Sequence, residues 1–146
     1  MPGTLTRTSP SWAMLPIRIA LGTIMFAHGA QKVFGVWVER DGGLTNWVNS
    51  AAPFPEMQPA WLWLGAAAFS EFIGGALVMI GLYTRVGAFF IACVMLVAIF
   101  GVHWRHGFFM NAGGFEFPFA LLGMALALLI YGGGAASIDS QMSGGK

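Results

Sequence analysis

The chain has 146 residues, of which 57% are hydrophobic and only 9% are charged, and its mean hydropathy is +0.71. A soluble globular domain carries about 25% charged residues, so the polar coat of such a domain is missing here. The formal net charge of +1 provides no clustered basic face, which excludes a nucleic-acid-binding protein. The composition also excludes a disordered chain and indicates an integral membrane protein whose main partner is the lipid bilayer.

Four apolar stretches follow one another along the chain, at residues 13–34, 60–83, 86–104 and 115–131. Each is too long for a strand and lacks the alternation of a half-buried strand, so we expect helices. A helix of about 20 residues matches the hydrocarbon core and satisfies its own backbone hydrogen bonds there. The sequence therefore predicts an all-α integral membrane four-helix bundle, forming one domain over residues 1–146, with one long extracytoplasmic loop between its first two helices.

The first stretch is expected to stay in the protein as a span. It is interrupted by Arg18 and followed by Gln31 and Lys32, a pattern unlike that of a cleaved signal peptide. Four spans place both termini on one side of the membrane. Basic residues outside the helices favour that side as the cytoplasmic one: Arg7, Arg85 and Lys146 lie there, against Arg40 and Arg105 on the other side.

The long connection at residues 35–59 contains a short amphipathic pattern. Leu44, Trp47, Val48 and Ala51 fall at helical spacing on one face. Two alternatives remain open: a short helix in the headgroup region with Trp47 at the interface, or a plain loop with scattered apolar residues.

The second and third stretches are separated only by a turn at residues 83–85, which makes them antiparallel neighbours. In the second stretch, Ala66, Ser70 and Gly74 repeat every four residues. A stripe of small residues lets membrane helices approach closely, so we expect this face to pack against another helix.

Ionisable side chains inside the apolar stretches are the strongest indication of a site. A charge at the bilayer centre costs at least about 2.5–3.5 kcal/mol on insertion scales, so such residues face the bundle interior and pair. The candidates for a shared polar core that binds a ligand are Arg18, His28, Lys32, Glu71, His103 and Glu116. Counting depth along the helices, we expect Glu71 to pair with Arg18 or to turn toward His28.

We expect most of these groups to form one cluster at the outer end of the bundle. It would hold Lys32 and the histidines at positions 28, 103 and 106 against Glu71 and Glu116. The side chains of Lys32, Arg105 and His106 could instead extend to the membrane–water interface and take no part in the cluster. Haem held by His28 and His103 is a minor alternative, and no metal site is predicted. The single cysteine, Cys93, excludes an internal disulfide and a cysteine-based metal site.

The order of these residues resembles the DoxX family of small membrane proteins. The resemblance covers residues 13–135. In the first half of the chain it rests on an early arginine, Arg18, and on an H-G-x-x-K element at 28–32. Farther along, it rests on E-x-x-G-G-x-L at 71–77, on G-L-x-T-R at 81–85, and on His103 with G-G-F-E at 113–116. It implies a four-helix protein of the bacterial plasma membrane. It also implies a link to redox chemistry: some members are the small subunit of a thiosulfate:quinone oxidoreductase, and others are membrane partners of soluble redox proteins in oxidative-stress defence. The resemblance assigns no catalytic residue.

The leading interpretation is a small membrane subunit or partner of a redox-linked complex, which is not catalytic alone. Its expected partners are a soluble redox protein, a larger membrane complex or a second copy of the chain. One alternative is a quinone-linked or sulfur-anion-linked oxidoreductase site in the polar core, with quinone as the candidate cofactor. Another is a small-solute or proton transporter that works as an oligomer.

Overall fold

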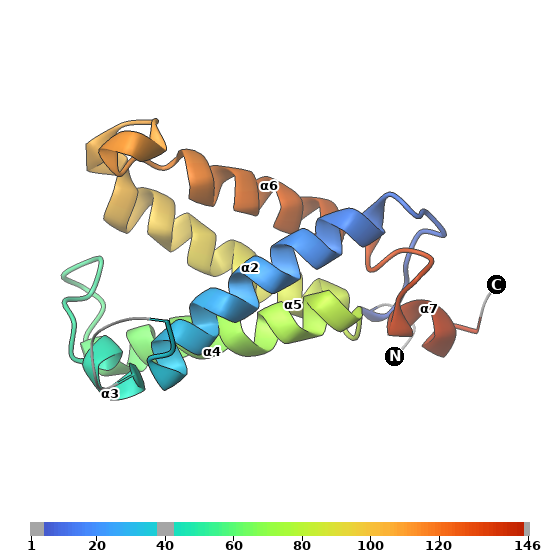
Figure 1. The fold of residues 1–146 in the computed structure, drawn as a ribbon, viewed down its shortest axis with the longest axis horizontal. Helices are drawn as coiled ribbons and strands as arrows, with labels where there is room; N and C mark the ends of the chain where they lie inside the picture. The colour runs from blue at the N-terminus through green and yellow to red at the C-terminus, as the bar shows by residue number, and fades with distance from the viewer. Residues whose placement is uncertain (1–4, 38–42, 145–146) are drawn as a thin grey trace.

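The computed structural model describes residues 5–37 and 43–144, and within them every regular element is a helix. Four helices are long: α2 (Met14–Phe34), α4 (Ala60–Ile80), α5 (Thr84–Val97) and α6 (Glu116–Tyr131). Two are short: α3 (Gly43–Val48), between α2 and α4, and α7 (Ile138–Met142), near the C-terminus (Figure 1). The all-α prediction is confirmed for this part of the chain, and of the two alternatives for the long connection, the short helix is the one present.

The long helices form two pairs that diverge from one end of the molecule. α2 packs along α4 and α5 packs along α6, while α4 and α5 also pack directly against each other in the region of Gly74 and Gly87. Figure 1 shows the pairs close together at the end that holds both termini and spread apart at the other end. We refer to these as the closed end and the open end.

Glycines set the helix spacing in the pair of α2 and α4. A Cβ atom added at Gly29 would lie 2.2 Å from the backbone nitrogen of Phe72, and one at Gly75 would lie 2.3 Å from the backbone nitrogen of Phe26. Any side chain at these two positions would push the helices apart. The two backbones therefore touch along this pair, as small residues in membrane helices allow.

The ends of α4 and α5 differ from the predicted ranges. α4 ends at Ile80, three residues before the predicted limit, because Gly81 adopts a left-handed conformation with φ 75°. After Val97, α5 continues as a π-helical segment, η1 (Ala98–His103), and a 3-10 turn, η2 (Trp104–His106). A second 3-10 turn, η3 (Met110–Ala112), lies before α6.

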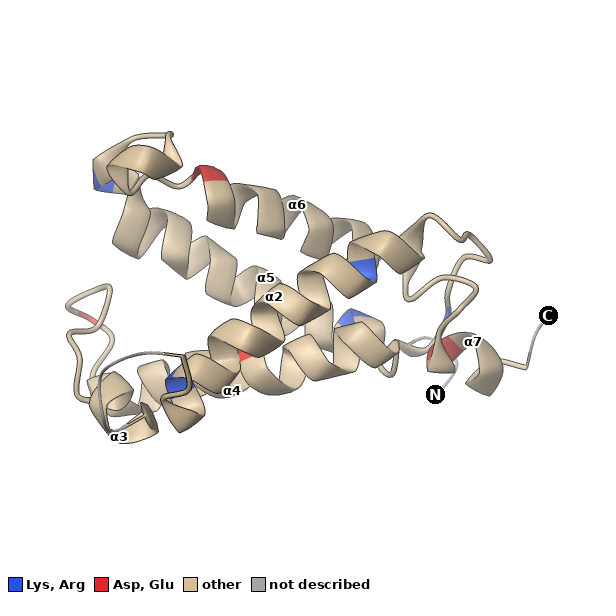
Figure 2. Ribbon diagram, in the orientation of Figure 1, with Lys and Arg blue, Asp and Glu red and all other residues tan. Residues whose placement is uncertain are grey.

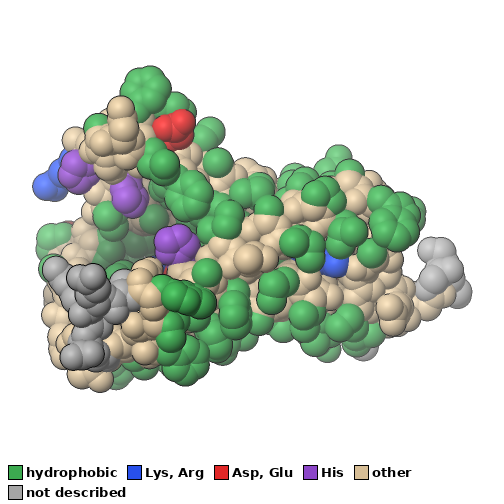
Figure 3. Space-filling model, in the orientation of Figure 1, with side chains coloured by type: hydrophobic (Ala, Val, Ile, Leu, Met, Phe, Trp, Pro, Cys, Tyr) green, Lys and Arg blue, Asp and Glu red, His purple; other side chains and the backbone are tan. Residues whose placement is uncertain are grey.

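Two helices of the described chain are long and apolar enough to cross a membrane: Ala60–Ile80 and the continuous segment Thr84–His106. α6 is apolar but shorter, and α2 carries charges near both ends. Figure 2 shows how few charged residues the helices carry, and Figure 3 shows hydrophobic side chains over most of the visible face. Ile73, Phe89 and Ile130 are each more than half exposed, which is typical of a surface that faces lipid.

Candidate functional site

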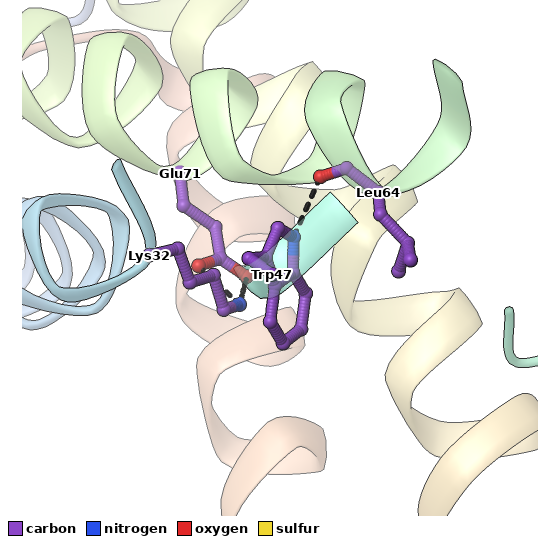
Figure 4. Close-up of polar contacts among 4 residues, drawn as sticks. All are labelled: Lys32, Trp47, Leu64 and Glu71. Atoms are coloured by element: carbon purple, nitrogen blue, oxygen red, sulfur yellow. Dashed lines mark hydrogen bonds and ion pairs between the residues drawn. The ribbon is translucent and has the colours of Figure 1, made fainter. Parts of the chain in front are cut away.

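An ion pair joins α2 to α4 near the open end. Lys32 lies in the last turn of α2, and Glu71 lies near the middle of α4. The Lys32 Nζ is 2.5 Å from both Oε1 and Oε2 of Glu71, so the carboxylate is held by both oxygens (Figure 4). Only 3% of the Glu71 side chain is exposed, against 19% for Lys32. The cation that contacts both oxygens compensates the cost of burying this carboxylate.

Trp47 of α3 covers this ion pair. Its ring centroid lies 4.5 Å from the Lys32 Nζ, within the range of a cation–π contact. Its Nε1 donates a hydrogen bond of 2.7 Å to the carbonyl oxygen of Leu64, on the first half of α4 (Figure 4). Trp47 therefore packs against α4 and Lys32, with its ring orientation fixed by both contacts.

A cavity of about 750 Å³ lies between α4 and the segment formed by α5 and η1. The ion pair and Trp47 form part of its wall, and most of the remaining wall is apolar. Small side chains leave this space where the helices diverge; on the two facing helices they are Ala66, Ala67, Ser70, Ala98 and Gly101. Figure 3 shows a hollow at the open end, with histidine side chains along one side of it.

The predicted stripe of small residues on α4 thus has two roles. Gly74 packs at the closed end, where a Cβ atom added at Gly87 of α5 would lie 2.9 Å from the Gly74 carbonyl oxygen. Ala66 and Ser70 lie nearer the open end and line the cavity. The expectation of close packing holds for one of the three residues, because α4 and α5 separate toward the open end.

His103 contributes to the cavity wall from η1. Its Nδ1 lies 2.7 Å from the carbonyl oxygen of Gly113. A carbonyl oxygen can only accept a hydrogen bond, so Nδ1 carries the hydrogen and donates it. In the neutral ring, Nε2 therefore has a free lone pair and can accept a hydrogen bond from a ligand.

Arg18 does not pair with Glu71, so that prediction is wrong. Its guanidinium is buried at the closed end, where Nη1 donates to the Gly133 carbonyl at 2.7 Å and Nη2 donates to the Ala136 carbonyl at 2.5 Å. The C-terminal segment folds back over the helices and supplies these acceptors. Arg18 therefore lies at the opposite end of the molecule from the cavity.

Sequence reasoning missed Asp139, a second buried charge at the closed end. Its side chain is 1% exposed, and its two oxygens accept hydrogen bonds from the backbone nitrogens of Tyr83 and Thr84, at 2.7 and 2.8 Å. These contacts cap the N-terminus of α5, where a carboxylate is favoured. Ser137, whose hydroxyl caps α7, is the sequence signal that could have indicated an ordered segment here.

The single outer cluster expected from the sequence is divided in the structure. His28 lies against α6, with its ring centroid 6.4 Å from that of Phe117. The Glu116 Oε2 accepts a hydrogen bond of 3.0 Å from the Met110 backbone nitrogen and so closes the loop before α6. His106 and Arg105 are exposed. Because the two helix pairs diverge, only Lys32, Glu71 and His103 of the six candidates line the cavity.

The arrangement favours an organic ligand over a metal ion. Within residues 5–37 and 43–144, no three His, Cys, Asp or Glu side chains gather closely enough to hold a metal. His103 lines this cavity and His28 does not, which disfavours a haem held between them there. The volume and the apolar walls suit a drug-sized molecule, for which the ion pair and the His103 ring provide the polar contacts.

Comparison with known proteins connects this site to one family. The sequence model of the DoxX family matches residues 13–104, a range that contains Lys32, Glu71 and His103. The chain is also 30% identical over 132 residues to a protein of Bacillus subtilis (strain 168) named "Putative oxidoreductase CatD", and the match covers 90% of this chain and 88% of that protein. No solved structure matches the chain.

Proposed function

Because the chain belongs to the DoxX family, we propose that it is a membrane-embedded subunit of a redox-linked complex and that it binds a quinone in the cavity beside Lys32 and Glu71. One observation carries the proposal: the wall of a large apolar cavity contains a single buried ion pair. A quinone has a flat apolar ring and two carbonyl oxygens, and this wall offers both kinds of contact.

The proposal places all four long helices across the bacterial plasma membrane, with the termini in the cytoplasm. Two helices have the length and composition of spans, and large apolar side chains cover the outside of the others. Exposed aromatic residues occur at both ends of the molecule: Trp12 and Tyr131 at the closed end, and Trp37 and Trp104 at the open end. Such residues mark the two membrane–water interfaces.

Quinone reduction requires a hydrogen-bond donor and a proton source at a quinone oxygen, and a residue of the cavity wall can supply both. Reduction of a quinone to a hydroquinone consumes two electrons and two protons. The Lys32 ammonium can donate a hydrogen bond and a proton to one quinone oxygen, and Glu71 holds that ammonium in place in an apolar setting. Trp63 and Phe90 provide aromatic walls for the ring.

A partner protein would supply the electrons, in keeping with the resemblance to membrane subunits of redox complexes and with the name of the relative from Bacillus subtilis. Isolation of the chain in a mild detergent tests this part of the proposal. We expect a redox protein to be recovered with it. Recovery of the chain alone, under conditions that preserve other membrane complexes, would count against the partner role.

Quinone binding can be measured on the purified chain in lipid nanodiscs. Trp47 and Trp63 line the cavity, so a bound quinone should quench their fluorescence in a saturable way. We expect Lys32→Met to raise the dissociation constant for the quinone about tenfold, because a hydrogen bond to a charged donor contributes about 1.5–3 kcal/mol to binding. Arg105→Gln, which removes an exposed charge away from the cavity wall, is the matched control. Quenching that does not saturate, or that is the same in all three proteins, would refute the proposed site.

A further inference from the structure

A second, smaller hollow lies next to the cavity, on the other side of the ion pair. Its volume is about 230 Å³, and it is bordered by the end of α2, by α3 and by Ser50, which follows α3. Three residues line both spaces: Lys32, Trp47 and Ser50. These three side chains therefore form the wall between the cavity and what we call the outer hollow.

The two spaces differ in their access to water. The outer hollow is bordered by the polar residues Gln31, Asn46 and Ser50, and the last two are exposed. The cavity lies between helices whose outward faces are apolar. The Lys32 ammonium is partly accessible, whereas Glu71 is almost fully buried. The ion pair thus stands at the boundary between a hollow with a largely polar lining and a cavity with a largely apolar one.

Trp47 is held in this boundary by two interactions. Its Nε1 is bonded to the Leu64 carbonyl, and Lys32 lies over its ring. An indole ring with both its edge and its face engaged has little freedom to swing aside. Its ring therefore has a fixed place in the wall between the two spaces.

From this geometry we infer that Trp47 is a specificity-determining residue, which limits the route between the outer hollow and the cavity to water and protons. The inference concerns the cavity of the proposed function. A bulky ligand would then have to enter between the helices from the lipid side, whereas protons reach the cavity through Lys32.

Lys32 can pass a proton to a ligand in the cavity and be reprotonated from the outer hollow. When a quinone oxygen, reduced by electrons from the partner protein, takes a proton from the Lys32 ammonium, a neutral amine and the Glu71 carboxylate remain. The amine then takes up a proton from the bulk solution, relayed by water in the outer hollow so that no hydroxide is left there, and the ion pair is restored. Protons for the ligand thus come from the side of the membrane on which α3 lies.

Cys93 makes the inference testable without a quinone. It is the chain's single cysteine, it lies in the cavity wall, and it is near the middle of the span Thr84–His106. In nanodiscs, a membrane-impermeant sulfonated methanethiosulfonate should react slowly with this thiol in the natural protein. In Trp47→Ala, water and reagent enter from the outer hollow, and we expect the rate to rise at least about tenfold because a hydrated thiol ionises.

Two variants serve as controls for this measurement. Trp47→Phe keeps a ring in the wall and should react as slowly as the natural protein. Trp63→Ala opens the cavity wall away from the outer hollow and should have no effect on the rate. Fast reaction of Cys93 in the natural protein, or equal acceleration in Trp63→Ala and Trp47→Ala, would overturn the inference.

One further variant tests the inference even if Trp47→Ala does not fold. In the background Cys93→Ser, Asn46→Cys places a thiol in the outer hollow and leaves Trp47 intact. This thiol should react at least about tenfold faster than Cys93 of the natural protein, because water reaches it. Equal rates would contradict the boundary. Failure of quinone binding would leave all of these results unaffected, so the two hypotheses can fail separately.

Discussion

Removal of the Lys32 ammonium should destabilise the protein more than removal of the Glu71 charge. In Lys32→Met, the Glu71 carboxylate remains without its cation, with only 3% of its side chain exposed. Loss of one partner of a buried ion pair costs about 3–5 kcal/mol in free energy of unfolding. Because Lys32 is itself 19% exposed, we expect the lower end of that range, about 3 kcal/mol.

The opposite change should be milder. In Glu71→Gln, the neutral amide still accepts a hydrogen bond from Lys32, and the ammonium can turn toward water in the outer hollow. We expect a cost of about 1–2 kcal/mol. The double variant Lys32→Met/Glu71→Gln contains no buried charge, so its cost should fall below that of Lys32→Met alone. The coupling between the two positions should therefore exceed about 1.5 kcal/mol.

These values can be measured by reversible unfolding of the purified chain in mixed micelles, with helix content followed by circular dichroism. Arg105→Gln removes an exposed cation, and it should stay within about 0.5 kcal/mol of the natural protein. The reasoning is refuted if Lys32→Met costs no more than this control. It is also refuted if the two single substitutions simply add in the double variant, since the charges would then not depend on each other.

The other predictions concern packing and capping, and the same unfolding assay checks them. Gly29→Ala should cost about 2 kcal/mol or more, because its Cβ atom would overlap the Phe72 backbone. Gly123→Ala, at a helical position with nothing within 4 Å of the added Cβ, should instead stabilise α6 by up to about 1 kcal/mol; equal effects would contradict the backbone contact between α2 and α4. Asp139→Ala should cost about 1–2 kcal/mol through loss of the cap on α5. Glu56→Ala, an exposed carboxylate, is its control, and a cost no larger than that control's would disprove the capping role.

The helices could be predicted because their signal is local. The predicted range 13–34 contains Met14–Phe34, and the range 115–131 contains Glu116–Tyr131. The short helix around Trp47 remained an alternative at the level of sequence, because six residues have little helical stability of their own. Its contacts with Lys32 and Leu64 come from elements distant in the chain, and no local pattern contains them.

The partner of Arg18 could not be predicted for a related reason. Depth along a helix axis places Arg18 and Glu71 within reach of each other, but it does not say which way each side chain points around its helix. The actual acceptors are backbone carbonyls of Gly133 and Ala136, and every residue carries such a group. Only the folding of the C-terminal segment distinguishes these two carbonyls from all others. A buried arginine in an apolar helix therefore signals a partner without identifying it.

The cavity follows from the way in which α4 and α5 diverge. Gly74 and Gly87 bring the helices together at the closed end, and the small side chains Ala66 and Ser70 cannot fill the space that opens farther along α4. Glu71 lies between these two regions, directly after Ser70 and three residues before Gly74. The carboxylate is thus close enough to the contact region to be buried, and close enough to the open end for Lys32 to reach it. The same spacing of small residues that closes one end of the helix pair therefore places a charged group in the wall of the space at the other end.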